Sequence, residues 1–206
     1  MKQTYNMLKS SLYSNKKLIL FLLLFTLLGI ISGTIFVLIL NDSDKSIIIN
    51  YISDFIKNIK VNKINITSNF MNLYIPDLLS SLLIWILGIS IIGIPVILFI
   101  YFSKMFVLGF TVATFILKYK FTGVIYSFLY LFPSSLIEII MYLILINYSF
   151  TLSYSLFKSF FKRGNIDFKP IMKRYVVILL ITIIILLFGS LYEVFISSNI
   201  LRFIIK

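Results

Sequence analysis

The sequence contains no cysteine and no histidine, and only 13% of its 206 residues are charged. Without these two residue types the chain cannot form disulfides, cysteine or histidine zinc sites, thiol nucleophiles or Ser-His catalytic pairs. Intramembrane aspartyl proteolysis would need two facing aspartates within the bilayer, and we expect all five aspartates to lie in hydrophilic connections or at a segment edge. The sequence therefore predicts no catalytic residue, no metal ligand, no cofactor and a protein that is not an enzyme.

Apolar residues make up 60% of the chain, and the mean hydropathy is +1.06. A typical soluble domain is about 45–50% apolar and ~25% charged, so this composition indicates an integral membrane protein. The 19 lysines and arginines outnumber the 7 acids. In a membrane protein such an excess marks cytoplasmic loops, and we expect no nucleic-acid partner. The expected fold class is an all-α, polytopic helical bundle in the lipid bilayer.

Hydrophobic runs predict the membrane-spanning helices, because a bilayer core about 30 Å thick needs roughly 20 apolar residues in a helix. Four runs meet this length: 18–40, 78–103, 134–157 and 175–198. The first is too long for the apolar part of a signal peptide, so we expect an uncleaved helix. In the second we expect Pro95 to kink a continuous helix, because membrane helices tolerate proline when neighbours satisfy the backbone.

A fifth region, 105–131, is hydrophobic but is interrupted by Lys118 and Lys120. Two forms fit it: one long helix whose lysines extend to the interface, or a short span followed by a re-entrant piece. We favour the broken form. The chain is then a single integral membrane domain over residues 1–206 with about five spans.

The basic residues predict the orientation of these spans. They concentrate in 1–17 and in 158–174, which we expect to face the cytoplasm. The stretch 41–77 contains four lysines and four aspartates and is expected to be an exported loop. The N-terminus then lies inside and the tail 199–206 is exported, although the two basic residues of the tail depart mildly from the charge rule.

Within the expected exported loop, apolar residues recur at the spacing of one helix face. These residues are Ile48, Ile52, Phe55 and Ile59. The pattern predicts an amphipathic helix. Such a helix either packs over the mouth of the bundle or docks a partner, and we favour the packed form.

Small residues predict where helices approach closely. Gly29 and Gly33 form a GxxxG pattern in the first span, and Gly109 is a further packing glycine in 105–131. Such residues let two helix backbones come into contact. The pattern fits packing within the bundle or a seam between two copies. We favour packing within the bundle, and self-association stays open.

Two acids lie within the predicted spans, where a charged side chain costs about 2.5–3.5 kcal/mol. Glu138 follows Pro133, which we expect to begin an inward helix, and Glu193 lies near the outer end of the last span. We expect both acids at a similar depth to Lys118 and Lys120. Three roles fit this set: a structural polar cluster, an ion or proton relay, and a surface that partners bind.

Three segments together resemble stage II sporulation protein M of endospore-forming bacteria. They are KMFVLGFTVATFI at 104–116, FPSSLIEII at 132–140 and GSLYEVFISSNI at 189–200. The chain departs from the family pattern at Ser198 and Asn199, where relatives often have a proline. It departs again at Ser134, where histidine or glutamine is frequent, so no imidazole chemistry is needed at that position.

The resemblance implies a noncatalytic component of the engulfment machinery, in which the mother-cell membrane migrates around the forespore. Family members anchor and localise two cell-wall hydrolases: stage II sporulation protein P, an amidase and endopeptidase, and stage II sporulation protein D, a lytic transglycosylase. The implied location is the multi-pass cell membrane on the mother-cell side of the septum and of the engulfing membrane.

We therefore hypothesise that the 41–77 loop and the outer ends near Lys118, Glu138 and Glu193 dock these hydrolases. An alternative function is a permease subunit that works with an ATP-binding cassette ATPase, which the broken third segment and the glutamate pair would suit. A third is a structural membrane protein without fixed enzymatic partners.

Overall fold

The computed structural model describes residues 16–61, 66–162 and 168–205, and almost all of these residues are helical. Within these ranges the structure contains no strand. The elements, in chain order, are α2 Lys16–Ile39, α3 Asp42–Lys60, α4 Ile66–Gly88, α5 Gly93–Tyr119, α6 Phe121–Tyr130, α7 Phe132–Lys162, α8 Phe168–Tyr192, the π-helical turn η1 Glu193–Ser197 and α9 Ser198–Ile205. Parts of the expected cytoplasmic segments, residues 1–15 and 163–167, lie outside the described residues.

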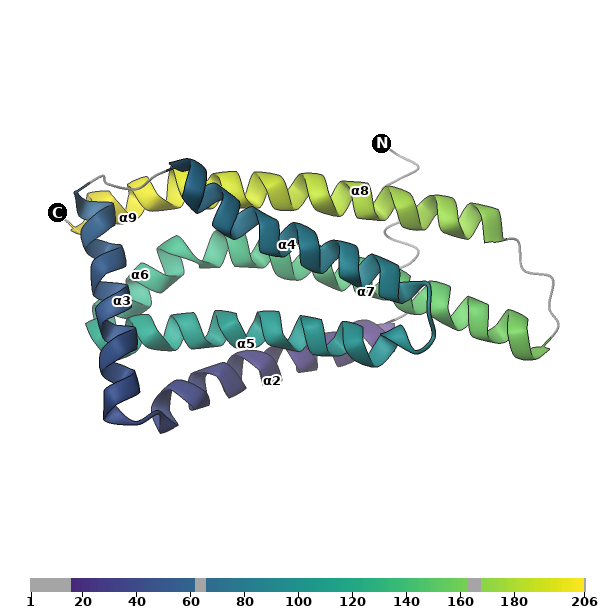
Figure 1. The fold of residues 1–206 in the computed structure, drawn as a ribbon, viewed down its shortest axis with the longest axis horizontal. Helices are drawn as coiled ribbons and strands as arrows, with labels where there is room; N and C mark the ends of the chain where they lie inside the picture. Colours follow the sequence, from purple (N-terminus) through teal and green to yellow (C-terminus); the bar gives the residue numbers. More distant parts are fainter. Residues whose placement is uncertain (1–15, 62–65, 163–167, 206) are drawn as a thin grey trace.

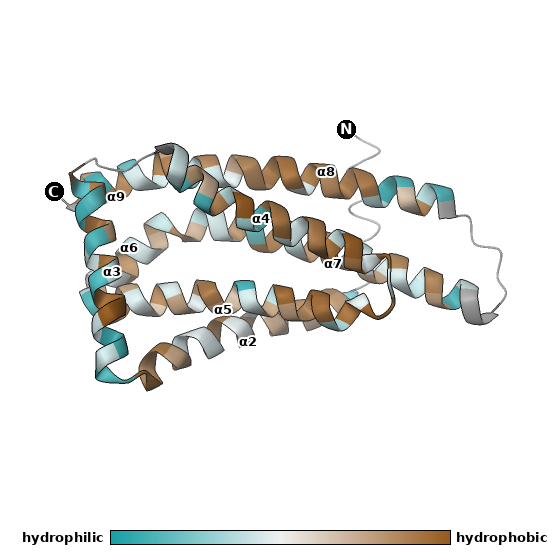
Figure 2. Cartoon of the chain, in the orientation of Figure 1, coloured by the Kyte–Doolittle hydropathy of each residue, from teal (hydrophilic) through white to brown (hydrophobic). Residues whose placement is uncertain are grey.

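Five stretches of the described chain are long and apolar enough to cross a membrane. They are Lys16–Ile39, Thr67–Gly88, Gly93–Tyr119, Phe132–Ser159 and Lys169–Ile204. α2 packs chiefly on α5, while α7 packs chiefly on α8 and α4. These spans are mostly hydrophobic along their length, whereas α3 carries a mixed surface (Figure 2). The expected all-α membrane bundle with five spans is confirmed.

Fully buried tyrosines join neighbouring helices inside this bundle. The Tyr101 hydroxyl on α5 lies 2.6 Å from the Thr26 hydroxyl on α2. The Tyr175 hydroxyl on α8 lies 2.7 Å from the Ser149 hydroxyl on α7 and donates to the Trp85 carbonyl of α4 at 2.9 Å. Hydrogen bonds of this kind contribute to helix association in a bilayer, where apolar burial alone gives little driving force.

The expected second span, 78–103, is wrong. The chain reverses at residues 89–92, so α4 ends at Gly88 and α5 begins at Gly93. The turn is closed by backbone bonds from Ser90 N–H to the Leu87 carbonyl and from Gly93 N–H to the Ser90 carbonyl. Pro95 lies in the first turn of α5, where its missing N–H leaves no helical bond unmade. The proline therefore begins a helix and does not kink one.

This shift moves two charged residues from the predicted segment edges into the bundle. The expected 41–77 loop is instead α3 together with the first half of α4, and Asp77 lies midway along α4. Lys104, expected at the cytoplasmic end of the second span, lies midway along α5. The expectation that every aspartate stays outside the spans is therefore wrong for Asp77.

The expected break in 105–131 is confirmed, and it falls at Lys120. This residue has a φ of 52°, the one positive φ of a non-glycine residue in the described ranges. α6 then folds back against α5, with Gly123 so close to the Phe115 carbonyl that a Cβ would overlap it. The helix before the break is not short, because α5 begins at Gly93 and its 27 residues extend about 40 Å.

The last helix continues beyond its expected end at residue 198. The π turn η1 connects α8 to α9 without a break, so most of the expected exported tail 199–206 is helical. Leu201 of α9 is fully buried against α3 and α6. This apolar contact explains why the helix continues. At the other boundary, α7 begins at Phe132, so Pro133 does lie at the start of a helix.

The amphipathic helix is confirmed as α3, which lies across one end of the bundle (Figure 1). We call this end the capped end. Ile56 and Ile59 are buried there in a cluster with Phe115, Tyr130 and Leu201. Ile52 and Phe55 pack against the same cluster, and Ile48 is half-buried. The helix therefore packs over the mouth of the bundle, as favoured.

The glycines expected to mediate packing lie between α2 and α5. A Cβ on Gly29 would lie 2.6 Å from the Met105 Cβ, and one on Gly109 would overlap the Ile30 carbonyl oxygen. A Cβ on Gly33 would overlap the Phe106 carbonyl oxygen. The GxxxG pattern therefore serves contact within the bundle.

We expect Gly33→Ala to destabilise the protein by about 1–3 kcal/mol, because backbone atoms of α5 cannot move aside for the added methyl. Gly189→Ala is the matched control, since its Cβ would meet only Ile137 Cγ2 at 3.8 Å. The control should be as stable as the wild type or slightly more so, because alanine favours helix. Unfolding of both variants in nanodiscs measures the difference, and equal stabilities would contradict the proposed α2 and α5 contact.

The helix order, together with the orientation expected from the basic residues, predicts the sidedness of single cysteines placed in this cysteine-free chain. Asp54→Cys on α3 should react with a membrane-impermeant maleimide in intact protoplasts. Ile92→Cys should react only in inside-out vesicles, because Ile92 is 84% exposed in the turn at the opposite end. A continuous 78–103 helix would instead bury residue 92 in the bilayer and leave it unreactive on both sides.

Candidate functional site

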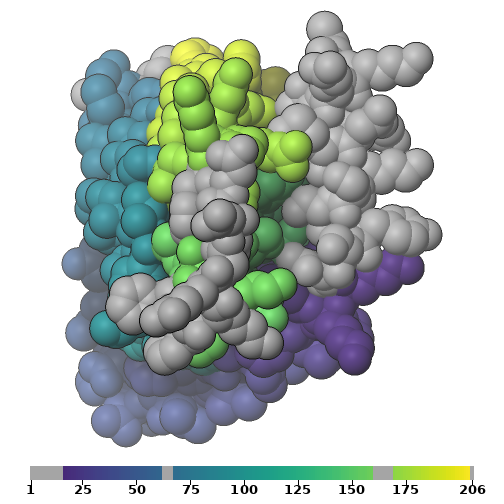
Figure 3. Space-filling view, turned by 90° about the vertical axis from the view of Figure 1, so that its right-hand side faces the viewer, coloured from purple at the N-terminus to yellow at the C-terminus, as the bar shows by residue number. Residues whose placement is uncertain are grey.

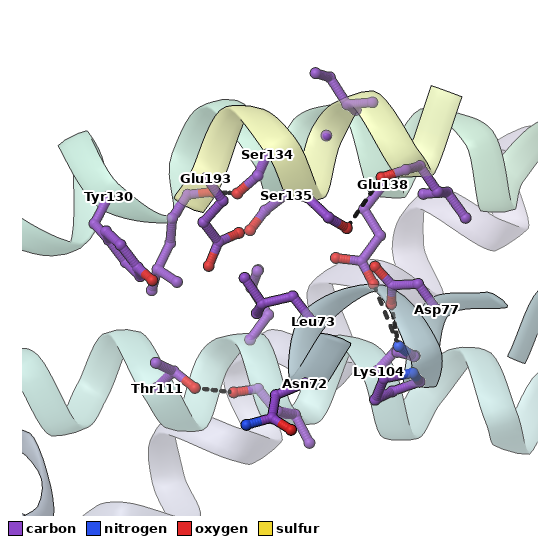
Figure 4. Close-up of a pocket in the computed structure, with 18 of the residues that line it drawn as sticks. Asn72, Leu73, Asp77, Lys104, Thr111, Tyr130, Ser134, Ser135, Glu138 and Glu193 are labelled. Atoms are coloured by element: carbon purple, nitrogen blue, oxygen red, sulfur yellow. Dashed lines mark hydrogen bonds and ion pairs between the residues drawn. The ribbon is translucent and has the colours of Figure 1, made fainter. Parts of the chain in front are cut away.

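A cavity of about 480 Å³ lies between the spans at the capped end. Its walls come from α4, α5, α7 and α8, and the inner face of α3 closes it on one side. Figure 4 shows acidic, basic and hydroxyl side chains directed into the space between these helices. The charged groups that line it are Asp77, Lys104, Glu138 and Glu193.

Lys104 joins three helices through its ammonium group. It forms a close ion pair and hydrogen bond with Asp77 Oδ1 of α4, and its Nζ lies 3.7 Å from Glu138 Oε1 of α7. The three side chains are only about 16–23% exposed. Because little water screens them, the attraction is stronger than in an exposed pair, but each charge has also lost its hydration. Removing any one of the three side chains would therefore leave a buried charge without its partner and destabilise the bundle.

Tyr142 of α7 contacts both the Lys104 ammonium group and the backbone of Asp77. Its ring centroid lies 5.8 Å from Lys104 Nζ, and its hydroxyl donates to the Asp77 carbonyl oxygen at 3.2 Å. The tyrosine is fully buried, so neighbouring side chains pack around its ring and hydroxyl. α4, α5 and α7 are thus registered against one another at mid-span by polar contacts.

Glu193 reaches the cavity from the π turn at the end of α8. It is 9% exposed, and the hydroxyl groups of Ser134 and Tyr130 lie beside its carboxylate. In the described chain no ammonium or guanidinium group lies within ion-pair distance of its carboxylate. π-helical turns are rare and often occur at functional sites, so the distortion at Glu193 indicates a candidate functional position.

The structure separates the polar residues that were expected to lie together. Glu138 and Glu193 both line the cavity, but their expected neighbours Lys118 and Lys120 are exposed. Lys118 borders a shallow hollow against α3, beside Asp54. The expectation was wrong because α5 begins at Gly93, which places these lysines at its far end. Pro133 does not line the cavity, although the two serines that follow it do.

Two central residues, Asp77 and Lys104, were missed by sequence reasoning. Each was assigned to the edge of a span because the second span was misplaced. A window over 66–88 would have shown an apolar stretch with Asp77 at its centre. The nine apolar or weakly polar residues on either side of Lys104 give the same signal for α5.

Comparison with protein families identifies the chain. The family model described as stage II sporulation protein M matches residues 18–198, which includes the cavity and nearly all five spans. The chain belongs to the stage II sporulation protein M family. It is a sporulation-related, multi-pass membrane protein. Searches of curated proteins and of solved structures found no match.

The cavity of this stage II sporulation protein M family member contains more acids than bases. Three carboxyl groups and one ammonium group line it. Over residues 16–61, 66–162 and 168–205, no three acidic side chains are grouped closely enough to hold a metal ion. An unbalanced carboxylate in a membrane interior is costly, so the excess must be neutralised by protons or by another cation.

We expect Lys104→Met to destabilise the protein by about 3–5 kcal/mol, because it leaves two carboxyl groups without their shared ammonium. Adding Asp77→Asn should restore part of the loss, since one of the stranded acids is then neutral. Lys118→Met on the same helix is the matched control and should change stability by less than about 0.5 kcal/mol. Denaturant unfolding in nanodiscs measures all three, and equal effects at residues 104 and 118 would contradict a stabilising role.

Proposed function

We propose that this protein is a noncatalytic membrane scaffold that anchors and localises peptidoglycan hydrolases at the sporulation septum and the engulfing membrane. Its partners in this proposal are stage II sporulation proteins P and D, which perform the cell-wall chemistry. The protein lies on the mother-cell side. Family membership supports this role, and so does the packing of α3 across the capped end.

The observation that carries the proposal is the rigid packing of α3 against the bundle. The helix is held through its inner face by α5 and α9, and the cluster also includes Tyr130 of α6. Phe55 and Tyr130 pack edge to face with ring centroids 5.3 Å apart. A surface that is already ordered loses little entropy when a partner binds, so α3 suits docking.

The outward face of α3 carries the type of side chain that anchors interfaces. Tyr51 is 75% exposed and Ile47, one turn earlier, is 52% exposed. Tyrosine is enriched among residues that contribute most to binding energy. The nearby pair of Asp54 and Lys57, 3.6 Å apart, is fully on the surface and adds a polar rim.

The balance of basic and acidic residues at the two ends of the bundle indicates which side of the membrane the outward face of α3 lies on. Where α7 ends and α8 begins, opposite the capped end, the described residues include exposed basic side chains and no acid, whereas the exposed lysines of α3 lie among three exposed aspartates. The basic residues at this end are Lys158, Lys169, Lys173 and Arg174. Figure 3 views the molecule from this end, with α7 and α8 in green toward the viewer. Under the positive-inside rule this end faces the cytoplasm, and α3 then faces the cell wall where the hydrolases work.

The docking surface in this proposal is smaller than the one expected from sequence. Glu138 and Glu193 line the cavity, and α4 from Ile66 onward is part of a span. We therefore assign docking to the outward face of α3 together with the exposed ends of Lys118 and Lys120.

The test is a crosslinking pull-down of tagged protein from sporulating cells, read by mass spectrometry against a vegetative control. The wild type should recover both hydrolases. Tyr51→Ser should reduce their recovery by roughly tenfold or more, because loss of a central aromatic anchor costs at least about 1.4 kcal/mol. Tyr154→Ser is the matched control, since Tyr154 is similarly exposed at 68% but lies toward the opposite end of α7.

Equal recovery by all three proteins would remove α3 from the docking surface.

The cavity favours a second candidate, a permease subunit that works with an ATP-binding cassette ATPase, because intramembrane acids often mark substrate pathways. Recovery of an ATPase without either hydrolase would establish that alternative and overturn the scaffold.

A further inference from the structure

We propose that the cavity beneath α3 binds an amphiphilic organic cation, with a primary ammonium group held by the carboxyl groups and an apolar chain along the cavity wall. The proposal concerns the cavity alone and holds whether the capped end recruits hydrolases or not.

The first argument is the position of the unbalanced charge. Lys104 serves both Asp77 and Glu138, so those two acids compete for one ammonium. Glu193 is buried beyond them and directed into the same space, and among the described residues its carboxylate has neighbouring hydroxyl groups but no ion pair. Hydroxyl groups stabilise a carboxylate but do not neutralise it. A ligand ammonium between Glu193 and Glu138 would supply the missing charge.

The second argument is the size and lining of the cavity. Its volume of about 480 Å³ lies in the range of sites that hold small organic molecules, roughly 300–1,000 Å³. Much of the wall is apolar, with Leu73, Leu108 and Leu186 among the lining residues. A bare metal ion would leave most of this space empty, whereas an ammonium with a hydrocarbon chain would fill it.

The third argument is the route of entry. α3 closes the capped end of the cavity through Ile52 and Phe55. The most exposed lining residues lie on α4 and α5: Asn72 and Pro76 are exposed, and Val107 is 58% exposed. The cavity therefore opens sideways between two membrane spans. A molecule that enters there must partition into the bilayer, which selects an amphiphile over a water-soluble cation.

A purely structural cluster accounts for less of this arrangement. Lys104 with one carboxyl would be enough to register α4, α5 and α7. Glu193 adds a buried acid without a cation, and the helix that carries it departs from α geometry at that residue. Both features cost stability and both face the cavity, which indicates a binding role.

The test uses the purified full chain in nanodiscs of zwitterionic lipid and a hydrophobic carbodiimide, which modifies carboxyl groups in apolar surroundings. Peptide mass spectrometry measures the labelling rate of Glu138 and Glu193 separately. Decylammonium is the probe, while decanol supplies the chain alone and methylammonium supplies the charge alone. We expect decylammonium to halve the labelling rate at a concentration at least tenfold lower than either control compound.

Each other result of this comparison overturns the proposal. Equal protection by decanol would mean that the cavity does not recognise the ammonium charge. Equal protection by methylammonium would mean that it does not recognise the hydrocarbon chain of the ligand. Absence of protection by all three means that the acids are neutralised by protons alone and the cavity binds no cation. These measurements on the wild type need no variant and involve no hydrolase, so their failure is separate from failure of the scaffold.

A variant then assigns the binding group. In Glu193→Gln, protection of Glu138 by decylammonium should weaken about tenfold, the effect of losing one charge-assisted contact. Glutamine keeps the shape and can still bond the neighbouring hydroxyls. Asp54→Asn, which neutralises an exposed acid on the outward face of α3, is the control and should leave protection unchanged. Unchanged protection in Glu193→Gln would exclude Glu193 from the site.

Discussion

The bundle depends on one shared ammonium group at mid-span. Lys104 pairs with an acid on α4 and an acid on α7, and therefore fixes three helices at one depth. Apolar contacts between helices could not do this alone, since lipid tails satisfy leucine and isoleucine as well as another helix does. The same ammonium also shapes the cavity. The two acids that it pairs with form the cavity wall farthest from the capped end. Close backbone contact between α2 and α5 then holds the lysine-bearing helix in place.

α3 connects the inside of the bundle to its outward surface. Its inner face contributes Ile52 and Phe55 to the cavity wall, and its outer face presents Tyr51. The helix has 19 residues, is amphipathic and is held by side-chain packing, without a side-chain cap hydrogen bond at its start. Its position therefore depends on the cluster around Phe115 and Leu201. α9 supplies Leu201, which explains why the last helix extends past the expected end of its span.

Hydropathy and spacing predicted the fold class, the number of spans and the amphipathic helix, because each depends on local composition. The boundary of the second span could not be predicted this way. Residues 89–92 are as apolar as the helices around them, so nothing in hydropathy marks the turn. Gly88, Gly93 and Pro95 were present as a signal, but a membrane helix also tolerates them. That one boundary placed Asp77 and Lys104 outside the bundle and gave Glu138 the wrong partners. Glu193 does lie in the last span, as expected, because its place there depends on that span alone.

Lys104 and Glu193 pose opposite energetic problems within one cavity. Lys104 has two acids within reach and gains from both, so its position is explained by the fold. Glu193 has none of this compensation in the described chain, yet it is the more buried of the two. Replacing it with an apolar residue would be expected to stabilise the bundle, since buried charges seldom repay their lost hydration. A buried acid that lowers the stability of the bundle is better explained by what the cavity binds than by the packing of α8.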